Sequence, residues 1–295
     1  MRVAVLALDD VFDLGLSSIL DVFQTANELI EMTALASPRF ELRIVGVRKR
    51  VRTFHGLGVP VRDAGTWAPD CVVVPAIGFK MPDPLENALA RSDVGDAVRL
   101  LQHWARRGAT MTAACIGTFV MAESGLLDGH EATTTWWLAP LFRRRYPSVR
   151  LDESHMIVKS GRFVTAGAAL SHMDLALWLV RTTSPHLAAL TARYLIVDAR
   201  PFQSAYALTD HLVHADPVVQ QFERWARASL TQPFSLNAAA RAVGCSKRTL
   251  ARRMQRVLGR SPLSYVQSLR VERAVHLLTT GSASVDEIAA RVGYA

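Results

Sequence analysis

A cysteine at the junction of a strand and a helix is the residue best placed for covalent chemistry. The β-type run Ala109–Ala114 leads directly into Cys115, and Ile116-Gly117 opens a helix that the pattern extends to Glu123. A thiol at a helix N-terminus feels the helix dipole and free backbone N–H groups, and both favour the thiolate. Such a sharp turn is typical of a nucleophile elbow. Cys115 is therefore the candidate nucleophile, and a small buried packing residue is the alternative.

Further candidate site residues follow another strand. The continuous apolar run Cys71–Pro75 is typical of a central parallel strand, and the loop Ala76-Ile77-Gly78 comes directly after it. Open α/β sheets bind ligands beyond the carboxyl ends of their strands, so we expect Ile77 and Gly78 to share a pocket with Cys115 and Ile116.

Two adjacent indoles are candidates for the other side of this pocket. We expect Thr135 and Trp136 to line it. An indole face attracts cations, so Trp136-Trp137 would suit a cationic or quaternary amine. One of the two tryptophans is expected to be an ordinary core residue.

The excess positive charge is confined to one end of the chain. Residues 226–295 contain 11 lysines and arginines against three acidic residues, a net charge of +8 that equals the charge of the whole chain. Within this segment, the helix Lys247–Leu258 places Leu250, Met254 and Val257 on one face. Its cationic side chains, Lys247, Arg248, Arg252 and Arg256, point elsewhere. An apolar inner stripe with a cationic outer stripe suits a helix in a DNA major groove, whereas charge alone would also fit a solvated basic face.

The elements that must position the cysteine alternate between strands and helices. The predicted strands are Val3–Leu8, Phe40–Val47, a short Val59–Arg62, Cys71–Pro75, Ala109–Ala114, Met156–Lys159 and Arg162–Thr165. The predicted helices are Leu16–Met32, Val94–Arg107, Gly117–Glu123 and Ser171–Arg181. This alternation predicts an α/β fold, a parallel sheet with helices on both faces.

The rest of the chain has a wholly helical pattern. Pro185, Pro201 and Pro217 punctuate a helical connector, after which the predicted helices are Leu236–Val243, Lys247–Leu258, Pro262–Thr279 and Ser284–Val292. The turn Gly244-Cys245-Ser246 would join the first two as a helix-turn-helix. We therefore predict a sensing and dimerisation domain over residues 1–185, a connector over 186–232, and an all-α DNA-binding domain over 233–295.

Composition restricts the class of protein. Half of the residues are hydrophobic and a fifth are charged, which favours a folded core over disorder. The first apolar run ends at Asp9-Asp10, too early for a signal peptide, and no stretch approaches the roughly 18 apolar residues of a membrane span. The three widely spaced cysteines are typical of a cytoplasmic protein. His211 and His214 lie one helical turn apart without a third ligand, so we predict neither a metal nor a cofactor.

Several short motifs follow one another over about 60 residues near the end of the sequence. They are Ser246-Lys247-Arg248-Thr249-Leu250-x-Arg252, Leu258-Gly259-x-Ser261-Pro262-x-x-Tyr265, Leu269-Arg270, Ala274, Leu277-Leu278 and Ile288-Ala289-x-x-Val292-Gly293-Tyr294. In this order they resemble the DNA-binding domain of the AraC family of bacterial transcription regulators. The resemblance implies two helix-turn-helix units joined by a long helix, with Lys247, Arg248 and Arg252 facing DNA. We extend this set to Arg253 and Arg256 on the same helix.

The resemblance also sets an expectation for the last helix. The sequence stops at Ala295, where the second recognition helix would begin, so the second unit is expected to be incomplete. The undersides of Ile288 and Val292 are then expected to be exposed.

The residues around the cysteine form a second set of motifs: Ala114-Cys115-Ile116-Gly117, Glu123-x-Gly125-Leu126-Leu127-Asp128-Gly129 and Ala132-Thr133-Thr134. Over about residues 1–185 they resemble the DJ-1/PfpI superfamily. Within it they resemble the GlxA-like branch, whose members carry an AraC-type DNA-binding domain. The resemblance implies a flavodoxin-like sheet, a homodimer and, in the enzymes, an acid and a histidine beside the cysteine. Asp13, or less well Asp10, would be the acid. Thr135 stands where the family pattern Thr-Thr-His has its histidine.

Without that histidine, the thiol has no base to activate it, so we expect a vestigial cysteine and no catalysis. The expected ligand pocket comprises Asp13, Ile77, Gly78, Cys115, Ile116, Thr135 and Trp136. The resulting hypothesis is a cytoplasmic transcription regulator that binds double-stranded DNA and RNA polymerase and responds to an amine or amino acid. The resemblance implies that it is an activator. The alternatives are a cysteine-dependent amidase or glyoxalase-like enzyme with a DNA-binding appendage, and a pocket that only supports dimerisation.

Overall fold

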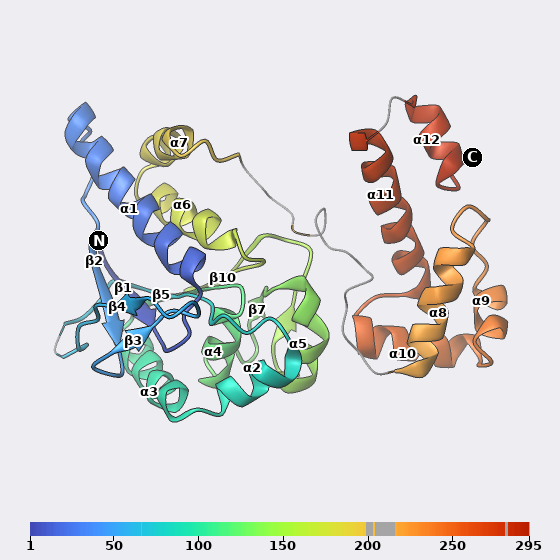
Figure 1. Cartoon of the computed structure of the whole chain (residues 1–295), viewed down its shortest axis with the longest axis horizontal. Coiled ribbons are helices and arrows are strands. Elements are labelled where there is room, and N and C mark those ends of the chain that lie inside the picture. The colour runs from blue at the N-terminus through green and yellow to red at the C-terminus, as the bar shows by residue number, and fades with distance from the viewer. Residues whose placement is uncertain (66, 199–202, 204–215, 281–282, 295) are drawn as a thin grey trace. The chain divides into compact units, whose positions relative to one another are not determined.

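A computed structural model describes residues 1–65, 67–198, 203, 216–280 and 283–294, and its contacts divide the chain into the units Met1–Ser204 and Ala205–Ala295 (Figure 1). This division differs from the three predicted parts because the helices expected to form a connector pack into the two units. Helix α7 (Pro185–Tyr194) buries Leu187 in the first unit's core, and α8 (Pro217–Ala228) buries Phe222 in the second unit's core.

The first unit contains a six-stranded sheet with the order β2-β1-β5-β6-β10-β9. These strands are β1 (Arg2–Ala7), β2 (Glu41–Gly46), β5 (Cys71–Val74), β6 (Thr110–Ala114), β9 (Ile157–Ser160) and β10 (Phe163–Ala166). All neighbours pair in parallel except β9, which is antiparallel to β10. The predicted parallel α/β fold is thereby confirmed.

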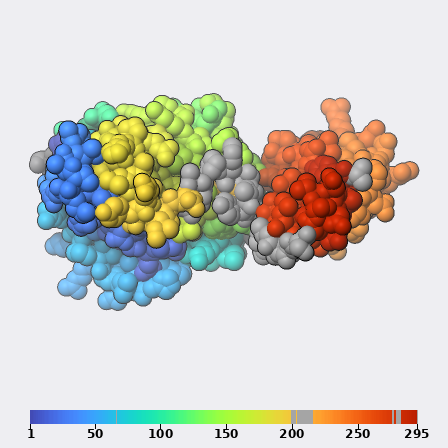
Figure 2. Space-filling model, turned by 90° about the horizontal axis from the view of Figure 1, so that it is seen from above, coloured from blue at the N-terminus to red at the C-terminus, as the bar shows by residue number. Residues whose placement is uncertain are grey.

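Helices cover both faces of this sheet, and β1 shows how the sequence directs them. Ala4 and Leu6 belong to the core beneath α2 (Pro82–Leu89), α3 (Ser92–Arg106), α4 (Gly117–Glu123) and α5 (Ala139–Arg145). The alternating residues Val3 and Val5 belong to the core beneath α1 (Asp13–Thr33), α6 (Ser171–Thr183) and α7. Figure 2 shows the surface of α1 directly beside that of α6 and α7, which contact it.

Three minor elements complete the first unit. Strand β3 (Val51–Arg52) pairs with β4 (Gly58–Val59), β7 (Glu131–Ala132) pairs with β8 (Arg150–Leu151), and a 3-10 turn at Trp136–Leu138 precedes α5. The predicted strand Val59–Arg62 is wrong beyond its first residue, although Arg62 forms a single bridge with Val45. Pro60 lacks the N–H that a ladder needs at that point.

The second unit consists of α8, α9 (Leu236–Ala242), α10 (Lys247–Leu258), α11 (Pro262–Thr280) and α12 (Val285–Arg291). Helix α10 has the predicted bounds because local signals fix both of its ends. The Ser246 hydroxyl accepts a hydrogen bond from the Thr249 N–H, and Gly259 ends the helix with a left-handed φ of 66°. None of the described helices is long and apolar enough to cross a membrane.

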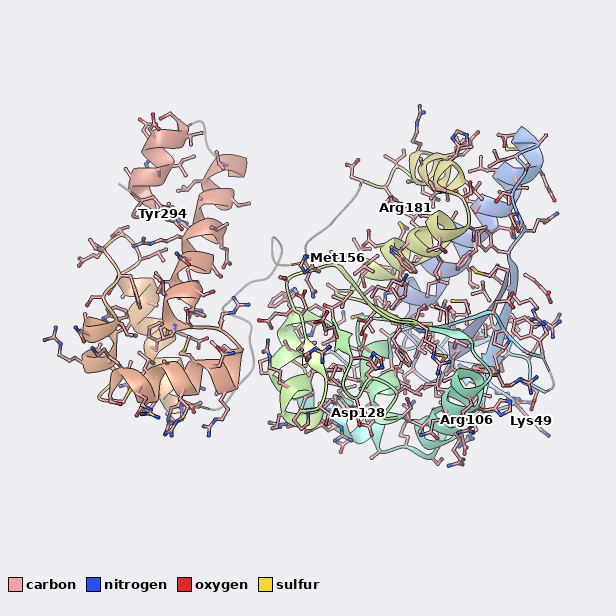
Figure 3. All side chains as sticks on the ribbon, turned by 180° about the vertical axis from the view of Figure 1, so that it is seen from behind. Lys49, Arg106, Asp128, Met156, Arg181 and Tyr294 are labelled. Atoms are coloured by element: carbon pink, nitrogen blue, oxygen red, sulfur yellow. The ribbon has the colours of Figure 1, made fainter. Side chains whose placement is uncertain are left out.

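The expectation of an exposed underside for α12 is wrong. Ile288 and Val292 are buried, and α12 lies against α11. The Arg270 guanidinium on α11 donates to the carbonyls of Leu230 and Gln232 and lies 5.3 Å from the ring of Tyr294, which Figure 3 labels. These contacts hold α12 within the second unit.

Candidate functional site

Cys115 lies on the strand-to-helix turn that the sequence predicts, between β6 and α4. Its φ of 57° is left-handed, a conformation that non-glycine residues rarely adopt. The Cys115 N–H donates to the Ala166 carbonyl at 2.8 Å, and the Cys115 carbonyl accepts from the Thr134 hydroxyl at 2.8 Å. The turn is therefore held from β10 on one side and from the segment after β7 on the other.

The thiol of Cys115 is not poised as a thiolate, contrary to the sequence-based expectation. Burial raises its pKa to about 12, although hydrogen bonds from Ile116 and Thr135 and the charge of Lys80 lower it in part. The side chain is 3% exposed, so desolvation of the charged form dominates over the short helix α4.

We expect Cys115 to react with iodoacetamide at pH 8 far more slowly than Cys245, which is partly exposed. With a pKa of about 12, on the order of one Cys115 thiol in ten thousand is ionised at this pH. Peptide mass spectrometry of the native chain over time measures both rates, and the denatured chain is the control in which they should converge. Equal rates in the native chain would contradict the burial argument.

A small pocket opens beside the thiol. Its lining is mostly apolar and comprises Phe12, Ala76, Ile77, Gly78, Lys80, Cys115, Ile116, Trp137 and Ala169. The predicted residues Ile77, Gly78, Cys115 and Ile116 are thus brought together. The cavity is about 20 Å³, close to the space that one water molecule needs, so a metabolite fits only after rim side chains move.

The other three predicted pocket residues lie differently. The Asp13 carboxylate pairs with His55, with 2.7 Å between Oδ2 and Nδ1, and its neighbour Phe12 lines the pocket instead. Thr135 is fully buried, with its hydroxyl beside the thiol. Trp137 lines the pocket rather than Trp136, whose ring meets it edge-on at 5.5 Å.

His172 lies behind the pocket wall, a position that the sequence did not predict. Its ring is fully buried at the start of α6; Nε2 accepts from the Ala76 N–H at 3.0 Å, and Nδ1 donates to the Ala169 carbonyl at 2.6 Å. Burial lowers its pKa to about 4, so the ring is neutral at neutral pH. Both ring nitrogens form hydrogen bonds with backbone groups of residues that line the pocket. His172 therefore supports the pocket wall and does not act as a base for the thiol.

Lys80 is the second residue that sequence reasoning missed. Its ammonium lies 5.9 Å from the centre of the Phe12 ring at the pocket rim, and its backbone carbonyl accepts a hydrogen bond from the Trp137 indole. A cation and two aromatic rings therefore border the pocket. No local pattern signals this, because residues 12, 80 and 137 meet only in the folded chain.

In the second unit, α10 has the predicted two faces. Leu250 and Met254 are fully buried, whereas Lys247, Arg248 and Arg252 are exposed. Within the described part of the chain, these three cations form no side-chain hydrogen bond or ion pair. Their contact with DNA stays a prediction, and the surface they form is free for it.

Arg253 and Arg256 differ from these three because both approach Asp216, the residue that precedes α8. Arg253 Nη1 lies 3.0 Å from Asp216 Oδ1, and Arg256 Nη2 lies 3.4 Å from Oδ2. The same carboxylate caps α8 by accepting from the N–H groups of Val218 and Val219. Arg253 is thus engaged in packing α10 on α8, while the Arg256 side chain remains 71% exposed.

We expect Asp216→Asn to destabilise the second unit by about 1–3 kcal/mol at pH 7. Burial would raise the pKa of Asp216, but hydrogen bonds from Arg253, Val219 and Val218 outweigh it and lower the pKa. A lowered carboxyl pKa stabilises the fold above the unfolded value near 4, and that stabilisation is lost as the pH falls below it.

Hydrogen exchange of the α8 and α10 amides in the 295-residue chain, at pH 7 and under acid conditions, measures this loss. Asp286→Asn on the exposed first turn of α12 is the matched control. A penalty for Asp216→Asn that persists undiminished at low pH would contradict the charged-cap argument.

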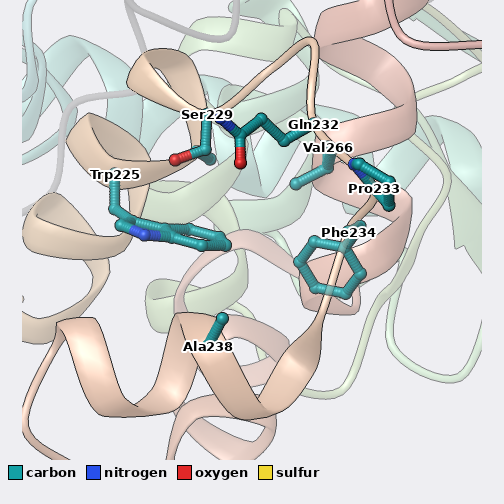
Figure 4. A pocket seen from close by; sticks show the side chains of 8 residues that line it. Trp225, Ser229, Gln232, Pro233, Phe234, Ala238 and Val266 are labelled. Atoms are coloured by element: carbon teal, nitrogen blue, oxygen red, sulfur yellow. The ribbon is translucent and has the colours of Figure 1, made fainter.

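A second cavity, of about 200 Å³, lies within the second unit (Figure 4). It is lined by Trp225, Ala226, Ser229, Gln232, Pro233, Phe234, Ala238 and Val266. The rings of Trp225 and Phe234 are 6.3 Å apart at their centres, and Gln232 is exposed. The cavity thus lies between α8, α11 and the residues that lead into α9, and no residue of α10 lines it.

His211 and His214, the pair weighed as metal ligands, lie outside the described residues. Among the residues that the structure does describe, no three histidine, cysteine or acidic side chains gather as a metal site would require.

Comparisons with known proteins match both units. Residues 1–182 match the DJ-1/PfpI family, and residues 239–295 match a helix-turn-helix domain. The chain is 30% identical over 240 residues to the HTH-type transcriptional regulator GbdR of Pseudomonas aeruginosa, covering 79% of this chain and 62% of that protein. It is 24% identical over 220 residues to the HTH-type transcriptional regulator GlxA of Rhizobium meliloti, covering 69% and 64%. The chain thus spans less than two thirds of the length of these relatives.

Solved structures resemble the first unit. An AraC family transcriptional regulator from Pseudomonas putida superposes with a TM-score of 0.55 at 21% identity, over 66% of this chain and 98% of that one. Drosophila melanogaster DJ-1beta superposes with a TM-score of 0.52 at 16% identity, over 67% and 98%. At these identities the likeness shows a shared fold.

Proposed function

The chain belongs to the DJ-1/PfpI family and carries an AraC-type helix-turn-helix domain, and we propose that it is a transcription regulator that binds a small molecule beside Cys115. The main support for this proposal is the exposed side chains of Lys247, Arg248 and Arg252 on α10, which form no ion pair among the described residues. The same chain carries a pocket whose cysteine has no base beside it among those residues. An α-helix fits into the DNA major groove, where lysine and arginine side chains can bind backbone phosphates and the edges of guanine bases.

The pocket supports binding better than turnover. Thr135 occupies the place beside the thiol where a base is needed, and both nitrogens of His172 are already engaged. A buried thiol with a pKa of about 12 is a poor nucleophile at neutral pH. The relatives named above are regulators, which also favours this function over a cysteine-dependent amidase or glyoxalase-like activity.

The rim of the pocket favours a particular class of ligand. The Lys80 ammonium suits a carboxylate, and the faces of Phe12 and Trp137 suit an apolar or cationic group. Amino acids and quaternary amines that carry a carboxylate have both features. Such a ligand changes DNA binding only to the extent that it binds one state of the protein more tightly than the other.

The remaining partners belong to the same proposal. A homodimer would place two α10 helices on two half-sites of double-stranded DNA, as paired helix-turn-helix proteins require. Activation would involve RNA polymerase, and the site of action would be the cytoplasm.

Selection of random DNA duplexes by the full chain, followed by sequencing, tests the DNA-binding half of the proposal. We expect an enriched motif bound much more tightly than unselected DNA. A thermal-shift screen with amino acids and quaternary amines tests the other half, because a ligand of the native state raises Tm. Lack of any enriched motif, together with turnover that depends on Cys115, would favour the enzyme instead.

A further inference from the structure

The cavity of the second unit has a lining that runs from the surface into the core of that unit (Figure 4). Gln232 and Pro233 are exposed, whereas Ala226 and Val266 are buried with the core. The volume is about 200 Å³, and an apolar cavity of roughly 150 Å³ already holds a benzene molecule. The cavity is therefore large enough for a molecule of one or two rings.

Two aromatic rings form adjoining walls of the cavity. Trp225 on α8 and Phe234, two residues before α9, have ring planes inclined by 65°. Figure 4 shows Ala238 of α9 on a third side, where its small side chain leaves the space in front of both rings unfilled. Aromatic rings attract one another in offset-stacked and in edge-to-face arrangements, so a third ring placed here has favourable contacts with both walls.

The polar groups of the cavity lie at one end. Figure 4 shows the Ser229 hydroxyl and the Gln232 carboxamide on the side away from Ala238. Neither side chain forms a hydrogen bond with another described residue, and each can both donate and accept one. None of the described lining residues is charged, so a carboxylate or an ammonium group would be desolvated here without an opposite charge. The lining therefore favours a neutral molecule with one polar end.

The wall between α8 and α9 is held in place by contacts outside the cavity. Arg270 of α11 donates to the carbonyls of Leu230 and Gln232, at 3.1 and 2.6 Å. The Ser235 hydroxyl accepts from the Ala238 N–H at 3.3 Å and caps α9. Collapse of the cavity would break these hydrogen bonds. A ligand therefore meets a preformed site and loses little affinity to ordering of the wall.

We propose that this cavity binds a neutral aromatic molecule of one or two rings that carries one hydrogen-bonding group, as phenol and indole do. The ring contacts Trp225 and Phe234. The polar group bonds with Ser229 or Gln232. This class differs from the carboxylate-bearing ligands that suit the Cys115 pocket. Only residues of the second unit take part, so the inference is independent of the proposed function.

Titration of the 295-residue chain with phenol and with indole, followed by NMR, tests the proposal. The indole N–H of Trp225 and the amide of Ala238 should shift to saturation, with a Kd for indole below about 1 mM. Benzoate should bind at least about tenfold more weakly than phenol because its charge would be desolvated. Cyclohexanol should bind at least about threefold more weakly because it has no aromatic face. No saturable shift with phenol or indole, or equal affinity for benzoate, would overturn the proposal.

Ala238→Leu tests the location of the site by filling the cavity. It should weaken indole binding by at least about tenfold in a chain whose Tm shows that it is folded. Ala242→Leu, at the exposed end of the same helix and outside the lining, is the matched control and should leave the affinity unchanged. Unchanged indole affinity in folded Ala238→Leu would place binding elsewhere and overturn the proposal.

Two milder variants test the polar end, and they do so even if Ala238→Leu does not fold. Gln232→Ala or Ser229→Ala should weaken phenol binding by about three- to tenfold, the loss of one hydrogen bond, and leave toluene binding unchanged. Gln221→Ala, on the exposed surface of α8 and outside the lining, is the control and should change neither. Equal phenol affinity in the parent chain and in both cavity variants would overturn the assignment of the polar end.

Discussion

Replacing Gly117 with alanine is expected to destabilise the first unit by about 3 kcal/mol or more. A Cβ at this position would stand 2.2 Å from the Val74 carbonyl oxygen and 2.7 Å from the Pro75 carbonyl oxygen. These are backbone atoms at the end of the central strand β5, so no flexible side chain can move aside. The clash would separate α4 from β5 at the point where Cys115 and the Ala76 loop meet.

Thermal and urea unfolding of the full chain measure this effect, and Gly95→Ala is the matched control. Gly95 lies inside α3, and a Cβ there would meet nothing within 4 Å. Alanine is the better helix former, so this control should raise stability by about 0.5–1 kcal/mol. A Gly117→Ala chain as stable as the parent would mean that α4 does not approach β5 as closely as described.

The second large effect is expected on DNA affinity. Arg248→Ala or Arg252→Ala should weaken binding to a selected duplex by about 1–3 kcal/mol if that guanidinium reads a base. The physical reason is loss of a bidentate pair with guanine, for which both exposed side chains are available on α10. Loss of a phosphate contact would instead weaken all duplexes similarly and reduce the salt slope by about one.

Fluorescence anisotropy over a range of salt concentrations separates these two cases. Arg99→Ala, which removes an exposed arginine from the first unit, is the control for net charge and should change neither affinity nor slope. Arg253→Ala should act differently, lowering stability, because its partner is Asp216. Unchanged DNA affinity for both Arg248→Ala and Arg252→Ala would show that α10 is not the recognition helix.

The fold was largely predictable because its signals are local. The continuous apolar runs of β1 and β5 and the Ser246 and Gly259 caps of α10 each act within a few residues. Helices α2 and α5 were not predicted, since prolines in their first turns resemble turn signals. Helices α7 and α8 were assigned to a connector because a helical pattern does not show which unit a helix packs into; α7 packs on α1 and α6, and α8 on α9 and α10.

The site was predictable only in part. Cys115 and the loop at Ile77 follow from where strands end, and the place of Thr135 beside the thiol follows from the family pattern. Lys80 meets Trp137 and His172 meets Ala76 across more than 50 residues of sequence, so no spacing rule could find these contacts. The pKa of the thiol was wrongly expected to be low because burial, a property of the whole fold, outweighs the helix end.

The alternation of side-chain direction along β1 has a consequence for where the pocket lies relative to the two cores of the first unit. Side chains of the strands point alternately into two cores, so the sheet separates the core beneath α2 to α5 from the core beneath α1, α6 and α7. The pocket residues Ile77 and Ile116 belong to one core, whereas α7, which leads out of the unit, belongs to the other. The two cores meet at the carboxyl ends of the strands, where Phe12 and Ala169, next to α1 and α6, line the pocket together with Ile77 and Ile116. A molecule in this pocket therefore contacts residues beside both cores at once.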